Sequence, residues 1–180
     1  MAESDEVIEQ TKQWINDVVV GCNFCPFASN VLKQKTAYYA VERSSEIDVA
    51  LNALLTELKR LDDEESIETS FLIFPNSFEK FDDYLDLVEA AEDLLAENDY
   101  EGVYQLASFH PLYLFEGATE KDAANYTNRS IYPMLHLLRE TSIDKALESY
   151  KDPGKIPENN IDFARKKGLL YMKMLRDACM

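Results

Sequence analysis

Three short segments rich in β-branched and aromatic residues recur along the chain, with room for one helix between each pair. They span residues 36–43, 69–74 and 103–109. The middle segment ends in the apolar run FLIF, which is typical of a strand buried on both faces. Connections of about 25 residues suit helical crossovers, which favour parallel strands. The spacing predicts an α/β fold, with a small, mostly parallel sheet of about three strands layered with five to seven helices.

Helical spacing of apolar residues occupies most of the remaining chain. It predicts an amphipathic helix over residues 5–20 that ends at Gly21, then a compact turn with a short helix over residues 22–34. Further helices are expected to begin near residues 45, 76, 133 and 141, and a terminal helix over residues 161–178 is interrupted by Gly168. Pro133 suits the first turn of the helix expected over residues 133–140. No linker or internal repeat divides the chain, so we expect a single domain over residues 1–180.

The charge of the chain is strongly negative and unevenly distributed. The 180 residues include 18 Lys and Arg and 34 Asp and Glu, which gives a net charge of −16. Residues 1–109 hold 7 basic and 24 acidic side chains, whereas residues 110–140 hold 3 and 4. A field of this sign repels nucleic-acid phosphates and anionic lipids, so we expect neither as a partner.

Two features of the sequence predict a cytoplasmic protein. No apolar stretch approaches the ~18 residues of a membrane span. The first ten residues, MAESDEVIEQ, are acidic where a secretory signal would be basic and then apolar. We therefore expect a cytoplasmic protein with no membrane association, and the sequence gives no indication of its oligomeric state.

The ends of two expected strands carry polar side chains that are candidates for a site. In open α/β sheets, ligands bind beyond the carboxyl ends of the strands. Asn76 follows the second expected strand, and His110 follows the third. We therefore expect both side chains near a ligand.

The segment from His110 to Arg139 is the densest in groups suited to chemistry. It contains both histidines of the chain, His110 and His136. It also contains the amide and guanidinium donors Asn125, Asn128, Arg129 and Arg139. An arginine beside amide donors suits a carboxylate or phosphate group, so a small anionic molecule is the expected ligand. The alternative is that these residues only form turns and caps, with Arg129 neutralising Asp122.

Cys22 and Cys25 form a C-x-x-C pair before a proline, and several interpretations of it are open. The pair is either half of a zinc site or a redox dithiol. Alternatively, Cys25 alone is a nucleophile activated by a histidine, or a small buried apolar residue. Cys179 is expected to be exposed and without a role.

Three separated segments resemble a known family. They are residues 11–28 (TKQWINDVVVGCNFCPFA), 106–117 (LASFHPLYLFEG) and 125–140 (NYTNRSIYPMLHLLRE). With the chain length, they make the sequence similar to the DUF1415 family of uncharacterised bacterial proteins. Cys25 agrees with the family pattern, whereas an apolar residue is usual at the position of Cys22 and proline at that of Ile131. The resemblance counts against a C-x-x-C dithiol or zinc half-site, and it implies no activity or catalytic residue.

The leading hypothesis is a small enzyme that acts on an anionic molecule. Cys25 is its nucleophile or ligand, and His110 or His136 is the general base. Arg129 and Asn128 hold the anionic group, and Asn125, Asn76 and Arg139 complete the set of substrate-binding candidates.

Two alternatives come from other functional classes. The first is a protein that binds a divalent metal through Cys25, His110 and His136. The second is a non-catalytic interaction module that presents an acidic helix over residues 78–97 to a basic partner. Its contact residues would be Glu89, Glu92 and Asp93.

Overall fold

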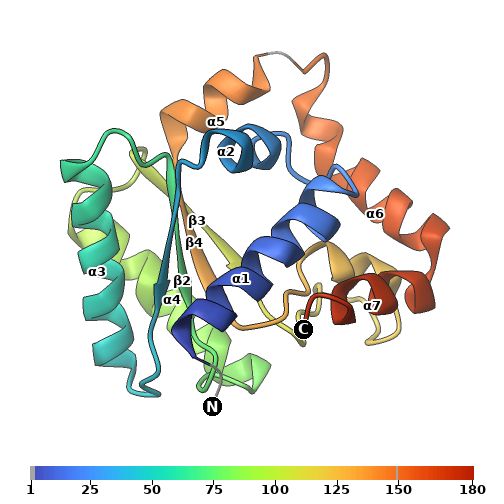
Figure 1. Cartoon of the computed structure of the whole chain (residues 1–180), viewed down its shortest axis with the longest axis horizontal. Coiled ribbons are helices and arrows are strands. Elements are labelled where there is room, and N and C mark those ends of the chain that lie inside the picture. The colour runs from blue at the N-terminus through green and yellow to red at the C-terminus, as the bar shows by residue number, and fades with distance from the viewer. Residues whose placement is uncertain (1–2, 149) are drawn as a thin grey trace.

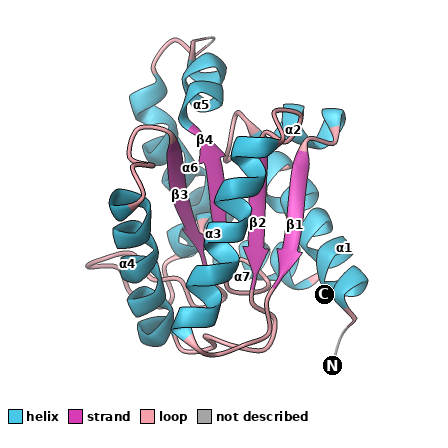
Figure 2. Ribbon diagram, turned by 90° about the vertical axis from the view of Figure 1, so that its left-hand side faces the viewer, coloured by secondary structure: helices cyan, strands magenta, loops and turns pink. Residues whose placement is uncertain are grey.

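Four strands form one mixed sheet in the computed structural model, which describes residues 3–148 and 150–180. In order across the sheet they are β1 (Ala37–Val41), β2 (Thr69–Ile73), β4 (Met134–Arg139) and β3 (Tyr104–Phe109). β1 and β2 are parallel, whereas β4 is antiparallel to both β2 and β3. The carboxyl ends of β1, β2 and β3 therefore lie at the same edge of the sheet, as Figure 2 shows for β1 and β2.

The α/β class is confirmed, but the helix predicted over residues 133–140 is wrong, because this segment is β4. Every residue of β4 except Arg139 is buried. A strand buried on both faces has no alternation of apolar and polar residues, and leucines spaced as in MLHLLR also fit a helix. The sheet consequently has one parallel pair and two antiparallel pairs.

Helices cover both faces of the sheet (Figures 1 and 2). One face packs against α3 (Ile47–Asp63) and α4 (Phe81–Glu97). The other is covered by α1 (Ser4–Trp14), α2 (Ala28–Gln34), α6 (Ile156–Lys167) and α7 (Leu169–Asp177), and α5 (Glu140–Leu147) directly follows β4. Among the described residues, no helix combines the length and apolar character needed to cross a membrane.

Two cores lie on opposite sides of the sheet. Leu72 and Leu135 face α3 and α4, where they join Leu54, Leu58 and Leu87. The alternate strand residues Phe71, Ile73 and Met134 face α1 and join Val7 and Trp14 there. The central strands therefore supply apolar side chains to both cores, which explains their continuous apolar runs.

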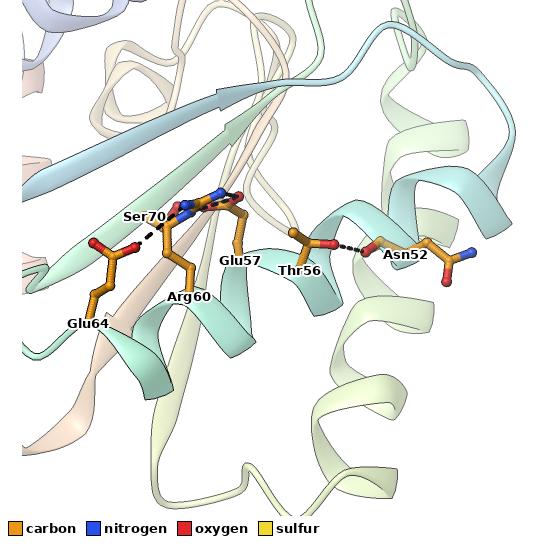
Figure 3. A network of polar contacts seen from close by, with 6 residues as sticks. All are labelled: Asn52, Thr56, Glu57, Arg60, Glu64 and Ser70. Atoms are coloured by element: carbon orange, nitrogen blue, oxygen red, sulfur yellow. Dashed lines mark hydrogen bonds and ion pairs between the residues drawn. The ribbon is translucent and has the colours of Figure 1, made fainter.

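A buried polar network fastens α3 to β2 (Figure 3). The Ser70 hydroxyl donates to the Glu57 carboxylate at 2.6 Å, and Arg60 Nε lies 3.2 Å from the same carboxylate oxygen. The Arg60 guanidinium also lies 3.9 Å from the centroid of the Tyr38 ring. Because the buried carboxylate has both an uncharged donor and a cation beside it, the network has a structural role.

The first helix is α-helical only in its first part. After Trp14 it continues as a π-helix, η1 (Ile15–Val20). Gly21 follows with φ −60°, so it is not the left-handed terminator expected from the sequence; Asn23, at φ 56°, is the first left-handed residue. Glycine is required at position 21 because a Cβ there would collide with the carbonyl oxygen of Asp17.

Replacing Gly21 should therefore destabilise the fold. We expect Gly21→Ala to lower the free energy of unfolding by about 1–3 kcal/mol, since the new methyl meets rigid backbone. Gly154→Ala is the matched control, because its nearest neighbour is a side-chain oxygen 3.9 Å away. Urea melts of the two variants test this prediction, and equal stabilities would contradict it.

Candidate functional site

A row of side chains crosses the sheet on the face covered by α1. Tyr39 pairs with Phe71, and His136 pairs with Phe71 on one side and with Ala107 on the other. The rings of Tyr39 and Phe71 stack with centroids 5.3 Å apart, and those of Phe71 and His136 with centroids 3.8 Å apart. The row therefore contains three stacked rings but ends in a single methyl group, that of Ala107.

A cavity of about 110 Å³ lies against this row. On the side opposite the sheet, the cavity is lined by the π-helix, by α2 and by the turn before α2. No Lys, Arg, Asp or Glu lines the cavity. The lining residues are Trp14, Ile15, Val19, Cys25, Phe27, Ala28, Val31, Leu32, Tyr39, Thr69, Phe71, Ala107, Phe109, His136 and Leu138.

His136 is a neutral imidazole with one nitrogen committed to the protein. The Thr69 hydroxyl donates its only proton to the carbonyl oxygen of Leu137, so the Nε2–H of His136 must donate to the Thr69 oxygen, 2.6 Å away. Nδ1 is then an acceptor, and no donor among the described residues bonds to it. Burial lowers the pKa of His136 to about 3, so the ring stays uncharged at neutral pH.

Cys25 lines the same cavity from the turn before α2. Burial raises the pKa of its thiol, although hydrogen bonds from the backbone of Phe27 and Ala28 partly offset this effect. Cys25 is therefore a neutral thiol at neutral pH, and its sulfur has no disulfide partner.

Trp14 is the single tryptophan of the chain, and it also lines the cavity. Its ring meets that of Phe109 edge to face, with centroids 5.3 Å apart. The indole N–H is buried and has no acceptor among the described residues. Buried donors without a partner are rare in folded proteins, so this unpaired N–H is a local cost to the fold.

His110 does not line this cavity, and both of its ring nitrogens are used. Nδ1 accepts a hydrogen bond from the backbone N–H of Leu112 at 3.0 Å, so Nε2 carries the proton and donates to the carbonyl oxygen of Phe78 at 2.8 Å. Burial lowers the pKa of His110. These bonds join the end of β3 to the turn before α4, in which Phe78 is left-handed at φ 55°. The geometry gives His110 a structural role.

Asn125 and Asn128 hold the loop between β3 and β4. The Asn125 side chain accepts from the backbone N–H of Phe115 and donates to the carbonyl oxygen of Thr119. The Asn128 side chain accepts from the Thr127 hydroxyl and donates to a backbone carbonyl on β3. Both amides are therefore occupied within the protein.

The two arginines of the predicted set lie apart from the cavity. Arg129 Nε donates to the carbonyl oxygen of Tyr113 at 2.9 Å, and its guanidinium lies 5.1 Å from the centroid of the Tyr126 ring. Arg139 bonds to the Leu61 and Glu64 carbonyls at the end of α3. Arg139 thus satisfies carbonyl groups that the end of a helix leaves unpaired.

Asn76 lies at the edge where the three parallel strands end, as expected, but outside the cavity. Its side-chain oxygen accepts a hydrogen bond of 2.6 Å from Arg43. Of the eight predicted site residues, only Cys25 and His136 line one cavity together.

The residues proposed as metal ligands are not brought together. In residues 3–148 and 150–180, no group of three or more His, Cys, Asp and Glu side chains could hold a metal ion. Cys22 is buried in the core and has no disulfide partner. Cys179 is 1% exposed, so the expectation that it is exposed is wrong; its thiol lies against the Leu175 carbonyl, 3.5 Å away.

Sequence reasoning missed the apolar side chains that build the cavity. Thr69 and Phe71 are two positions apart on β2, so their side chains point to the same face of the sheet. This spacing is visible in the sequence. The sequence does not indicate the partners of His136, because the spacing of residues 133–140 predicts a helix instead of a strand. Ala107 has no signal at all until the register of β3 and β4 is known.

The low pKa of His136 should make the protein less stable at mildly acidic pH. Below pH 6.5 the unfolded chain binds a proton here that the folded chain does not take up until about pH 3. This residue alone should lower the free energy of unfolding by about 1.4 kcal/mol per pH unit within that window. Between pH 7 and pH 5, urea melts of His136→Gln should therefore lose about 2 kcal/mol less stability than the unaltered chain. Equal losses would contradict the burial of a neutral His136.

Comparisons with known proteins identify a family. The sequence profile of DUF1415 matches residues 6–174, which is nearly the whole chain. No curated protein and no solved structure matches the chain. The chain therefore belongs to DUF1415, a family described as proteins of unknown function.

Proposed function

We propose that this protein binds a small, uncharged, largely apolar molecule in the cavity beneath α1 and α2. The observation that carries the proposal is a largely apolar cavity whose wall includes a few polar groups, those of Cys25, Thr69 and His136 among them. Ligand sites are usually concave and mostly apolar, with a few polar groups that fix the orientation. An engineered cavity of ~150 Å³ binds benzene. This space is smaller but partly open, so it suits a ring of about that size with one polar substituent.

The lining favours an uncharged ligand over the anionic one expected from the sequence. No cation lines the cavity, and a charged group placed there would lose its hydration without gaining a partner. Nδ1 of His136 accepts hydrogen bonds, so the preferred ligand carries a hydroxyl or another neutral donor. Phenol and the short alcohols have this chemistry.

Trp14 fluorescence tests the proposal, because the single tryptophan lines the cavity. We expect phenol analogues that do not absorb near 295 nm, such as cyclohexanol, to change Trp14 emission in a saturable manner. His136→Phe should weaken cyclohexanol binding about tenfold, because the hydrogen bond to Nδ1 is lost. His136→Phe should change the binding of cyclohexane little, because cyclohexane has no hydroxyl to donate to Nδ1.

Ala107→Leu is the blocking variant, since its larger side chain occupies the cavity. It should abolish cyclohexanol binding while the protein stays folded, because filling a cavity offsets the added bulk. Ala96→Leu, on the exposed side of α4, is the matched control and should bind as the unaltered chain does. Absence of any saturable response in the unaltered chain would contradict the proposal.

A thiol-dependent enzyme is the second candidate. The observation that favours it is that Cys25 receives backbone hydrogen bonds and shares a cavity with a neutral imidazole. The Cys25 sulfur would attack the carbonyl carbon of an uncharged ester, forming a C–S bond as the C–O bond to the alcohol breaks. The thiol proton would leave through His136 Nδ1 to the departing alkoxide. The raised pKa of Cys25 and the lowered pKa of His136 both oppose this transfer, so binding ranks first.

Mass spectrometry distinguishes the enzyme from the binding protein. If Cys25 is a nucleophile, p-nitrophenyl acetate should add one acetyl group to it and release one equivalent of p-nitrophenol. Cys25→Ala should abolish both results, whereas Cys179→Ala should leave them unchanged. Acetylation that is equally fast in the urea-unfolded chain would remove the enzyme hypothesis.

A further inference from the structure

A second apolar recess lies directly outside the cavity and shares part of its wall. It is an open groove of about 320 Å³ between the turn before α2, the helix α5 and the start of α6. Its floor and sides include Phe24, Pro26, Ile143, Leu147, Ile156 and Pro157. No charged residue lines the groove, although 29% of the chain is charged.

Three residues belong to both the groove and the cavity: Cys25, Phe27 and Leu138. Phe27 and Leu138 pack together with Val31, and Ile143 of α5 packs against the same cluster. The wall between the two spaces is therefore made of side chains, and Cys25 is at the junction. The cavity and the groove adjoin at these three side chains, so a ligand longer than the cavity would reach the groove by displacing them.

We propose that the natural ligand is an unbranched aliphatic molecule with an uncharged polar end. This inference rests on the proposed function. The polar end bonds to His136 Nδ1 inside the cavity, and the chain passes Cys25 and lies in the groove. His136 is the only histidine in either lining, and its Nδ1 accepts no hydrogen bond from the described residues, so it is the acceptor to which we assign the polar end.

The dependence of affinity on chain length follows from this arrangement. A buried methylene contributes about 0.8 kcal/mol, which is roughly a fourfold change in Kd, and a methylene in an open groove contributes part of that. Affinity should therefore continue to rise after the cavity is full. A closed cavity without the groove would instead exclude longer chains.

The experiment is a titration of the full chain with 1-butanol, 1-pentanol, 1-hexanol, 1-heptanol and 1-octanol, followed by Trp14 fluorescence. We expect Kd to fall about two- to fourfold with each added methylene through 1-octanol. Leu147→Asn, in the groove, should weaken 1-octanol binding about tenfold and leave 1-butanol binding unchanged. Leu85→Asn is the matched control, because Leu85 is exposed on α4, and it should affect neither alcohol.

Retention of 1-butanol binding shows that Leu147→Asn is folded. If 1-butanol binds but Kd stops falling or rises beyond 1-pentanol, the groove is not part of the site and this inference is overturned, while the proposed function stands. If Leu147→Asn binds 1-octanol as tightly as the unaltered chain does, this inference is likewise overturned and the proposed function stands. If no alcohol binds the unaltered chain, the proposed function fails and this inference fails with it.

Discussion

The stacking of His136 on Phe71 is the contact on which the site depends. It exists because β4 enters the sheet antiparallel between β2 and β3, which places His136 beside Phe71 on one side and Ala107 on the other. A stacked aromatic pair contributes about 0.5–1.5 kcal/mol beyond its burial, and the Thr69 oxygen fixes the rotation of the imidazole ring. The cavity lies against this row, which ends at the single methyl group of Ala107.

The uneven charge of the chain corresponds to its two faces. The acidic helices α3 and α4 cover one face of the sheet, and the cavity and groove, both without charged lining, lie on the other. Acidic side chains on α4 such as Glu89 and Glu92 are exposed, so they keep that face hydrated. An interaction of this helix with a basic partner stays a prediction, as does the cytoplasmic location.

The sequence was sufficient for the α/β class, for three of the four strands and for the break between α6 and α7 at Gly168. These features depend on local patterns: β-branched runs, helical spacing and a glycine with φ 88°. The fourth strand and the site depend on long-range pairing. His110, Asn125 and Asn128 have the residue types of a catalytic site. Each side chain is instead hydrogen-bonded to backbone groups that come close to it only in the folded protein. Cys25 and His136, 111 positions apart, line one cavity because β4 is a strand that places His136 in the sheet.

A crystal structure of the protein soaked with phenol tests the central claim most directly. The account predicts one phenol in the cavity between Ala107 and Cys25, with its hydroxyl oxygen about 2.7–3.0 Å from Nδ1 of His136 and the His136–Thr69 bond intact. A cavity that is filled by rearranged side chains, or a phenol bound only elsewhere on the molecule, would contradict it.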